Sequence, residues 1–494
     1  MNGDFGLLIT KTITKTAIRM ETLHSSLLEN TKPFQYMLTK EEFLSHLYEQ
    51  YENPLEAEAV LDGEYAKYHL EAYSPPMPDA LPEPIKLLTS RVPDHLKPAV
   101  AMSVFPPLGA HYRDTRFHYI DNRDYEPTFM CVLAAEMSSG KSAINKPIKY
   151  IMADIEERDE ENRQRDHAWK AECERLGANR THPKRPEDLV IQQLPADMNN
   201  AVFVQRLMDA KGRFLYTQVD EIDLLSSFTT NMRGRLGASA VIRLAFDCAE
   251  YGQMRVGPAS ISGRATIRWN WNASSTIQRV RKFFAEGVAD GTLSRISFAT
   301  IVRDPVLFGW ENDLPVFGEY GPDFADQLKP FIEAINLCGG IITCPEALAW
   351  AKAERSKMVN FARESDDKAY AIFSRRAVLM GFFRAMTLYV MNGMQWTPEI
   401  EAFASWSTEY DMWCKCRFFH DLMLKEINGE AQATHPGPRN LLDQLPAVFT
   451  RADAMALRLA EGKKGNPSDM LRQWKSRGYI IPLDKNTFKK LPRE

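Results

Sequence analysis

The stretch of sequence that decides the fold is Glu126-Pro-Thr-Phe-Met-Cys-Val-Leu-Ala-Ala-Glu-Met-Ser-Ser-Gly-Lys-Ser142. Its first part, to Leu133, is an apolar run of strand length, and a helical pattern follows Ser142. A phosphate-binding loop needs backbone N–H groups at a helix start, a lysine for the β and γ phosphates, and a hydroxyl for Mg²⁺. We therefore predict a nucleotide-binding loop formed by Ala135, Glu136, Met137, Ser138, Ser139, Gly140, Lys141 and Ser142.

The same tripeptide, Gly-Lys followed by Ser or Thr, is short enough to arise by chance in a chain of 494 residues. Its place between a strand and a helix is what favours the functional interpretation. The loop departs from the usual pattern at Ala135, where a glycine is expected. Alanine can serve there if its φ stays negative. A site that no longer binds nucleotide stays an alternative.

A pair of carboxylates follows a second predicted strand about eighty residues later, in Val219-Asp220-Glu221. A carboxylate at the end of a buried strand can hold Mg²⁺, and the next one can polarise the attacking water. We assign these roles to Asp220 and Glu221. The alternative is a strand end that carries two solvated carboxylates.

Two further residues are candidates for the same chemistry. Asn272, with Ser274 as second choice, comes at the end of a predicted strand and would contact the γ phosphate; the alternative is that Asn272 only starts a turn. Arg295, in Gly291-Thr-Leu-Ser-Arg295, precedes another strand and would act on the nucleotide of a neighbouring subunit. Arg295 has many competing arginines, and all of them could be surface charges.

Predicted strands at Leu189 to Gln192, Phe214 to Val219 and Ala265 to Trp271 alternate with helices up to about residue 322, which predicts an α/β domain with a largely parallel sheet. Beyond Pro322 the pattern becomes helical, with predicted helices that include Lys368 to Met391 and Thr397 to Ile427. The charged run Asp154 to Asp166 is expected to be a solvated helix face. We expect these divisions of the chain: a small helical region at 1–73, a proline-rich linker at 74–84, a P-loop core at 85–322, a helical domain at 323–430 and a winged-helix-like unit at 436–494.

The last unit is predicted from two helices, Thr450 to Ala460 and Ser468 to Arg477, and a hairpin that follows them. Residues 461–494 hold nine Lys or Arg against four Asp or Glu, while the whole chain has a net charge of -4. The basic residues Lys463, Lys464, Arg472, Lys475 and Arg477 would contact DNA phosphates. A winged helix that binds protein is the alternative.

The bulk composition excludes several other classes. Charged residues make up 26% and hydrophobic residues 44% of the chain, which is ordinary for a globular protein. Seven cysteines without a CxxC pair argue against a zinc site or a disulfide framework. We find no signal peptide and no apolar run of ~20 residues, so we expect a cytoplasmic protein without a membrane partner.

Several of these segments together resemble a primase-associated P-loop ATPase family of bacterial mobile elements, which is catalogued as a domain of unknown function and is similar to virulence-associated E-type helicases. The resemblance covers about residues 80–430 and includes Ser138 to Ser142, Gln193-Leu-Pro-Ala-Asp197 and Val219 to Glu221. The turn from Gly291 to Arg295 is similar to the family's glycine-leucine-leucine-x-arginine signature, with Thr292 departing from it. The resemblance implies a RecA-like or AAA-like core, assembly into a ring such as a hexamer, and replication partners such as a primase.

These observations predict an ATP- and Mg²⁺-dependent helicase or translocase that acts on single-stranded or forked DNA in the replication of a mobile element. A helicase loader or initiator that ATP switches, and that binds DNA without unwinding it, is a second possibility. A defence-type NTPase is a third.

Overall fold

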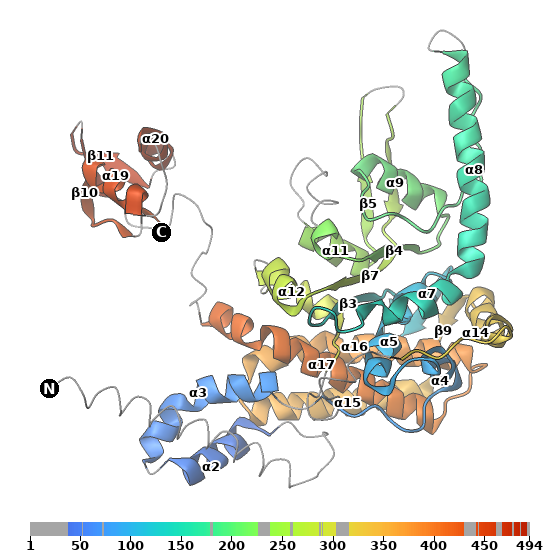
Figure 1. Ribbon diagram of the computed structural model, residues 1–494, viewed down its shortest axis with the longest axis horizontal. Coiled ribbons are helices and arrows are strands. Elements are labelled where there is room, and N and C mark those ends of the chain that lie inside the picture. The colour runs from blue at the N-terminus through green and yellow to red at the C-terminus, as the bar shows by residue number, and fades with distance from the viewer. Residues whose placement is uncertain are drawn as a thin grey trace. The chain divides into compact units, whose positions relative to one another are not determined.

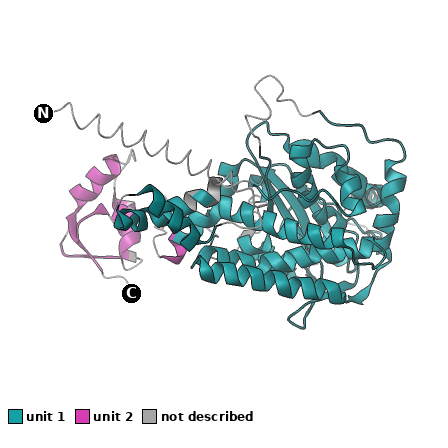
Figure 2. Cartoon of the chain, turned by 90° about the horizontal axis from the view of Figure 1, so that it is seen from below, with its two compact units in different colours: residues 1–424 teal, residues 425–494 magenta. Residues whose placement is uncertain are grey.

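The fold is taken from a computed structural model, and Figure 1 shows its elements. It describes residues 38–51, 53–71, 74–177, 181–225, 238–256, 260–285, 288, 290–302, 316–428, 441–442, 444–460, 467–476, 479–484 and 486–491. The chain forms two compact units, Met1–Leu424 and Lys425–Glu494, which are coloured separately in Figure 2. Each unit has its own hydrophobic core and is described by itself.

A four-stranded parallel sheet forms the centre of the first unit, in the strand order β4-β7-β3-β8. The strands are β3 (Met130–Ala134), β4 (Leu215–Val219), β7 (Trp269–Ser275) and β8 (Ser297–Ala299). Every residue of β3 is buried, as expected for a strand that is covered on both faces. The predicted α/β class with a parallel sheet is therefore confirmed.

Helices cover this sheet and extend from it. The helical segments of the first unit are α2 (Lys40–Gln50), α3 (Pro54–Glu71), α4 (Glu83–Thr89), η1 (Asp94–Leu96), α5 (Lys97–Ser103), α6 (Phe105–Gly109), η2 (Lys141–Ile144), α7 (Asn145–Ile151), α8 (Ala153–Leu176), α9 (Asn200–Asp209), α11 (Ala238–Phe246), α12 (Ile277–Phe284), η4 (Leu293–Arg295), α14 (Phe324–Leu337), α15 (Pro345–Glu364), α16 (Lys368–Met391) and α17 (Pro398–Ile427). Figure 1 shows α8 projecting from the body of the unit.

Two strand predictions need correction. The predicted strand Leu189 to Gln192 is only a bridge between Gln193 and Tyr216, supported by backbone hydrogen bonds on both sides of Tyr216. The predicted strand 265–271 divides near residue 267, where the chain leaves one sheet for another. Its first half belongs to β6 (Gly263–Thr266), which pairs antiparallel with β5 (Glu250–Gln253), and its second half begins β7.

The charged helix α8 is not solvated on all faces. Asp159, Asn162 and Asp166 are buried. Asp159 accepts hydrogen bonds from the backbone N–H groups of Gln192 (2.8 Å) and Gln193 (2.6 Å). Since a parallel segment that is not fully paired leaves backbone groups unsatisfied, these side chains complete the bonding of the bridge segment.

The helices after residue 323 are those that we expected to form a separate domain, 323–430. They belong to the first compact unit. Strand β9 (Gly340–Ile342) pairs parallel with β1 (Thr115–His118), which also pairs with β2 (Asp124–Tyr125). On α17, the carboxylate of Asp411 accepts from the backbone N–H of Phe298 in β8 at 2.8 Å. These contacts join the helical segment directly to the α/β core.

The proline-rich segment 74–82 contains no helix or strand, and α4 begins at Glu83. The carbonyl of Pro75 accepts a hydrogen bond of 3.1 Å from the buried indole of Trp406 on α17. The segment is therefore packed on the first unit at this point. In the part of the chain that the structure describes, no helix is long and apolar enough to cross a membrane.

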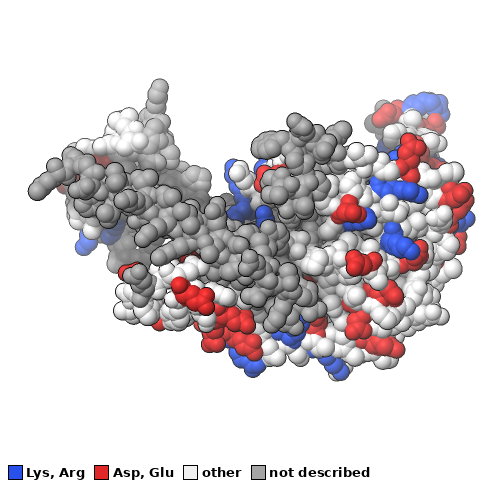
Figure 3. Space-filling model, turned by 60° about the horizontal axis from the view of Figure 1, so that its bottom comes forward, with Lys and Arg blue, Asp and Glu red and all other residues white. Residues whose placement is uncertain are grey.

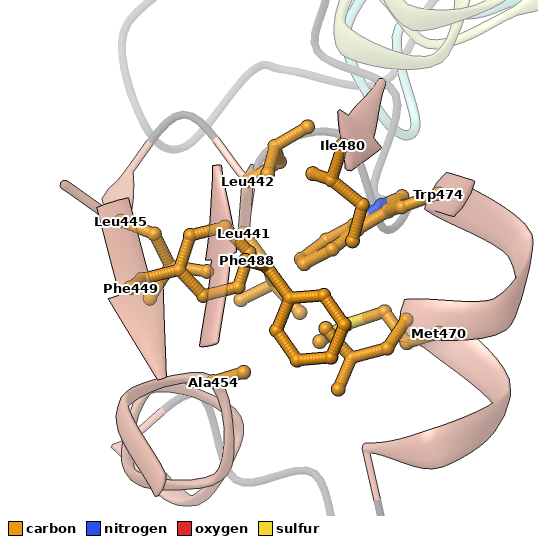
Figure 4. Packing of buried hydrophobic residues seen from close by; sticks show 10 residues of the cluster. Leu441, Leu442, Leu445, Phe449, Ala454, Met470, Trp474, Ile480 and Phe488 are labelled. Carbon is orange, nitrogen blue, oxygen red and sulfur yellow. The ribbon is translucent and has the colours of Figure 1, made fainter. Parts of the chain in front are cut away.

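The second unit contains β10 (Val448–Thr450), α19 (Arg451–Ala460), α20 (Ser468–Ser476), β11 (Ile480–Pro482) and β12 (Thr487–Lys490). The strands form an antiparallel sheet in the order β10-β12-β11. Figure 4 shows its core, in which Phe449, Trp474 and Phe488 meet between the sheet and the helices. The predicted succession of two helices and a hairpin is confirmed for this unit.

Candidate functional site

The candidate phosphate loop follows β3 directly and turns back through two residues with positive φ. Ser138 has φ 57° and Gly140 has φ 88°, after which the 3-10 turn η2 begins at Lys141 and leads into α7. Ala135 is not among the described residues with positive φ, so the missing glycine imposes no strain at that position. The local geometry is that of a strand, a tight loop and a helix.

The ammonium group of Lys141 folds back over this loop. Its Nζ donates to the carbonyl of Glu136 at 2.7 Å and to that of Ala135 at 3.4 Å. Partial burial lowers the pKa of Lys141, while the carboxylates of Glu221 and Glu136 oppose that shift. The lysine thus lies close enough to Glu221 for their charges to interact.

The hydroxyl groups of the loop differ in their surroundings. Ser139 is 1% exposed, and its Oγ has no hydrogen-bond partner among the described residues. Ser142, the predicted magnesium ligand, is exposed, as are Glu136, Met137 and Ser138. A buried hydroxyl without a partner is rare in a folded protein. Here it lies within the loop that is the candidate anion site.

The carboxylates of Asp220 and Glu221 follow the last residue of β4. Glu221 accepts a hydrogen bond of 2.9 Å from Oγ of Ser275, the last residue of β7. The guanidinium of Arg279 on α12 lies 3.7 Å from Oε2 of Glu221 and 2.8 Å from Asp223. The backbone carbonyl of Asp220 accepts a hydrogen bond from Oγ of Ser274 at 2.8 Å. Asp220 itself is exposed, so its carboxylate is open to solvent.

The parallel sheet brings the loop and these carboxylates together at the carboxyl ends of its strands. Ala134 of β3 is in register with Ser275 of β7, and the N–H of Ala135 donates to the carbonyl of Ser275 at 3.2 Å. Gln218 of β4 donates to Asn145 of α7 at 2.8 Å, which links the carboxylate strand to the helix after the loop. The loop, Ser275 and Glu221 are therefore consecutive neighbours at the carboxyl ends of the strands.

Asn272 lies away from these strand ends. It is 1% exposed and in register with Cys131, three residues before the end of β7. Its Oδ1 accepts from the hydroxyl of Tyr216 at 2.9 Å, and its Nδ2 donates to the carbonyl of Ser103 at 3.0 Å. Because both ends of the amide bind groups of the core, the structure does not bring Asn272 to the candidate phosphate loop.

Arg295 lies at the opposite ends of the strands: it precedes the amino end of β8, whereas the loop follows the carboxyl end of β3. Its side chain is 12% exposed and binds Asp247 at 3.0 Å and the carbonyl of Gly291 at 3.1 Å. Its guanidinium also lies 5.9 Å from the ring centroid of Phe246. The side chain of Arg295 therefore binds groups of its own chain, and the structure does not place it at the candidate phosphate loop.

Sequence reasoning missed Ser275 and Arg279 as neighbours of Glu221. A signal for both was present: Thr276 caps α12 through its side chain, which accepts from the N–H of Arg279. A Thr N-cap marks the start of a helix and hence the end of the preceding strand. Counting back from Thr276 would have placed Ser275, not Asn272, at the end of β7.

A magnesium ion at this site would depend on the nucleotide. No group of three or more His, Cys, Asp or Glu side chains suited to a metal occurs among the residues with described positions. The exposed oxygen groups of Ser142 and Asp220 are of the type that Mg²⁺ prefers, and Mg²⁺ commonly uses one or two protein ligands with phosphates and waters. The donor set therefore fits a metal that binds together with a triphosphate.

Basic residues of the second unit form another candidate surface. Arg472 and Lys475 are exposed on α20, while Lys463, Lys464 and Arg477 lie outside the described residues. On the first unit, the face drawn in Figure 3 has Lys and Arg interspersed with Asp and Glu, so neither sign dominates there. A polyanion would need a local basic patch.

Comparison with known proteins gives no assignment: the chain matches no protein-family model and no curated protein sequence.

Proposed function

We propose that the chain is an ATP-hydrolysing P-loop protein that acts as a DNA helicase or translocase in the replication of a mobile element. The observation that carries this proposal is the meeting of the Gly140–Lys141 loop with Glu221 at the carboxyl ends of the strands of a parallel sheet. In open α/β sheets, ligands bind at the carboxyl ends of the strands. Lys141 follows Gly140 in a tight loop, and the carboxylate of Glu221 nearby is oriented by Ser275. This combination suits the transfer of a phosphoryl group to water.

The residues at the carboxyl ends of these strands have separate roles in the proposed reaction. Backbone N–H groups of the loop and Lys141 would bind the phosphates, and Glu221 would accept a proton from the attacking water. Ser142 and Asp220 would hold Mg²⁺, which supplies charge neutralisation for the phosphates. Ser275 and Arg279 hold the carboxylate of Glu221 and so set its direction.

The proposed role of Arg295 in a neighbouring subunit requires a homo-oligomer, such as a hexameric ring. Its position at the strand ends opposite to the loop is compatible with action on another copy, but it would have to exchange its bond to Asp247 for the nucleotide. Mixing Lys141→Ala subunits with Arg295→Ala subunits tests this role. Recovery of ATP turnover in the mixture supports action between subunits, and no recovery contradicts it.

ATP turnover with and without single-stranded DNA tests the function as a whole. Lys141→Ala should abolish nucleotide binding, and Glu221→Gln should keep binding but lose about 100-fold or more in turnover. Matched controls are Lys149→Ala on the following helix and Glu174→Gln on α8, both exposed. Turnover that depends on neither Lys141 nor Glu221 would refute the assignment.

A strand-separation assay then distinguishes the alternatives. A helicase separates a forked substrate with ATP, whereas an ATP-switched loader or initiator binds DNA without separating it. The helix, helix and hairpin of the second unit, if it is a winged helix, would suit either partner. Turnover without any DNA effect would instead favour a defence-type NTPase.

A further inference from the structure

A cluster of cations lies at the amino ends of the strands, opposite to the candidate nucleotide loop, which follows a carboxyl end. Arg113 and Arg213 form an isolated antiparallel bridge just before β4 begins at Leu215. Residues that lie directly opposite each other across such a bridge project from the same face, ~5 Å apart at Cβ. Two arginines are therefore held side by side, although like charges in this arrangement are destabilising.

The local backbone adds a third cation. The N–H of Arg213 donates to the carbonyl of Ala210 at 3.1 Å, and the two residues between them have positive φ, 50° at Lys211 and 87° at Gly212. This is the geometry of a tight type I′ turn, which places the exposed Lys211 at its tip. A Cβ on Gly212 would lie 3.0 Å from Oδ1 of Asp114, so the turn packs against the segment of Arg113.

Arg158 on α8 completes the cluster. It donates to Oε1 of Gln192 at 2.7 Å, and Gln192 donates in turn to the carbonyl of Phe214 at 2.6 Å, beside Arg213. Its carboxylate neighbour Asp159 is fully buried and already accepts two backbone N–H groups. The Nε of Arg158 is buried and has no hydrogen-bond partner among the described residues.

The cluster is short of negative charge. No described carboxylate lies within ion-pair distance of Arg213, and Arg113 has only Asp114, at 3.4 Å on the surface. Partial burial lowers the pKa of Arg213, and the charges of Arg113 and Arg158 lower it further, against the opposing effect of Asp114. Three carboxylates lie near these four cations: Asp114, Asp159, which pairs with Arg158 at 3.2 Å, and Asp188, which pairs with Arg165 at 2.7 Å and whose charge also interacts with that of Lys211. Positive charge therefore remains in excess, and Arg213 contributes to it without an ion-pair partner among the described residues.

We propose that Arg113, Arg158, Lys211 and Arg213 bind the phosphodiester backbone of single-stranded nucleic acid. Guanidinium groups match phosphate oxygens with two parallel hydrogen bonds, and three of the four residues are arginine. No exposed large apolar side chain of the described chain belongs to the segments 110–114, 155–160 or 210–214. A protein interface needs an apolar centre, whereas a phosphate backbone needs only charge.

The inference rests on the proposed DNA partner and adds a contact surface in the first unit, far from the nucleotide loop. The experiment measures binding of a labelled oligothymidylate to the full chain at several salt concentrations. For Arg113→Gln/Arg213→Gln we expect weaker binding, on the order of tenfold, and a salt slope of log K smaller by about 1.4. The control is Arg175→Gln/Arg363→Gln, which removes two exposed arginines elsewhere.

The outcomes separate the two proposals. If the wild type does not bind the oligonucleotide, the DNA partner fails and this surface fails with it. If the wild type binds and the double variant has the same affinity and slope, only this inference is overturned. Competition by polyglutamate as effective as competition by inorganic polyphosphate would also overturn it, in favour of an acidic protein.

Folding of the double variant is not a confounding factor. Because the substitutions remove a like-charge pair, we expect an unchanged or higher Tm, measured by thermal unfolding. ATP turnover without DNA is recorded for each variant and should equal that of the wild type, since the surface lies at the opposite ends of the strands.

Discussion

The hydroxyl of Ser275 donates a hydrogen bond of 2.9 Å to Oε2 of Glu221, joining the ends of two adjacent parallel strands. The carboxylate is 54% exposed, so this bond and the guanidinium of Arg279 are what restrict its orientation. In the proposed reaction, Ser275 is a positioning residue for the base.

Substitution of Ser275 tests this relationship. For Ser275→Ala we expect kcat of ATP hydrolysis to fall by about tenfold with KM nearly constant. The carboxylate of Glu221 would still be present as the base, but it would be less often in the orientation that accepts the proton. Ser274→Ala is the control, since Oγ of Ser274 binds only the backbone carbonyl of Asp220. Equal kcat values for both variants and the wild type would contradict the positioning role.

Asn272 should matter for stability and not for chemistry. Asn272→Ala leaves the buried hydroxyl of Tyr216 and the carbonyl of Ser103 without partners, at a cost of roughly 2 to 4 kcal/mol in the free energy of unfolding. Denaturant unfolding measures this loss, and turnover per folded molecule should not change. The exposed Asn360→Ala is the control. A normal stability with lost turnover would restore Asn272 as a candidate phosphate contact.

Gly140 should be required for the shape of the loop. Its φ of 88° costs about 1 to 2 kcal/mol in any residue with a Cβ, so we expect Gly140→Ala to weaken nucleotide binding and lower stability. Gly63→Ala is a matched control, because Gly63 lies in α3 and an added Cβ meets nothing within 4 Å. That variant should gain about 0.5 to 1 kcal/mol in stability. Unaltered nucleotide affinity in Gly140→Ala would argue against the loop assignment.

Glu354 predicts a pH dependence of stability. It is 6% exposed on α15, and burial raises its pKa from 4.5 to about 7, with Lys357 opposing and Glu409 reinforcing the shift. A raised carboxyl pKa means that the folded state holds the proton more tightly than the unfolded state. Its contribution is therefore fully present below pH 4.5 and is lost as the pH rises to about 7.

The measurement is Tm against pH for the wild type and Glu354→Gln, which mimics the protonated form. We expect the wild type to lose stability relative to the variant between about pH 5 and 7, by no more than about 3 kcal/mol. Glu364→Gln, on the exposed end of the same helix, controls for the substitution. Parallel profiles for the wild type and Glu354→Gln would contradict the shift.

The local pattern of the sequence was sufficient for several elements. It predicted α16 at Lys368–Met391 without error and placed α17, α19 and the C-terminal hairpin to within about two residues. The reason is that amphipathic periodicity and caps act over a few residues: Asp367 accepts from the N–H of Tyr370, and Thr450 from that of Asp453.

Strand register could not be predicted in this way. Whether Asn272 or Ser275 reaches the carboxyl end depends on where β7 stops relative to β3 and β4, and a displacement of three residues separates a core amide from a residue that binds Glu221. The sequence also suggested a separate helical domain. Local patterns could not reveal that β9 pairs with β1, because these two strands are more than two hundred residues apart in the chain.

By itself, the sequence determined the loop from Ala135 to Ser142, the carboxylate pair at Asp220 and Glu221, and the alternation of strands and helices, all of which depend on neighbouring residues. Only the tertiary structure decided which side chains meet Glu221, that Asn272 belongs to the core, and that Arg113 and Arg213 lie side by side. The physical reason is that strand pairing and burial are long-range: they are fixed by which segments share backbone hydrogen bonds and exclude water together.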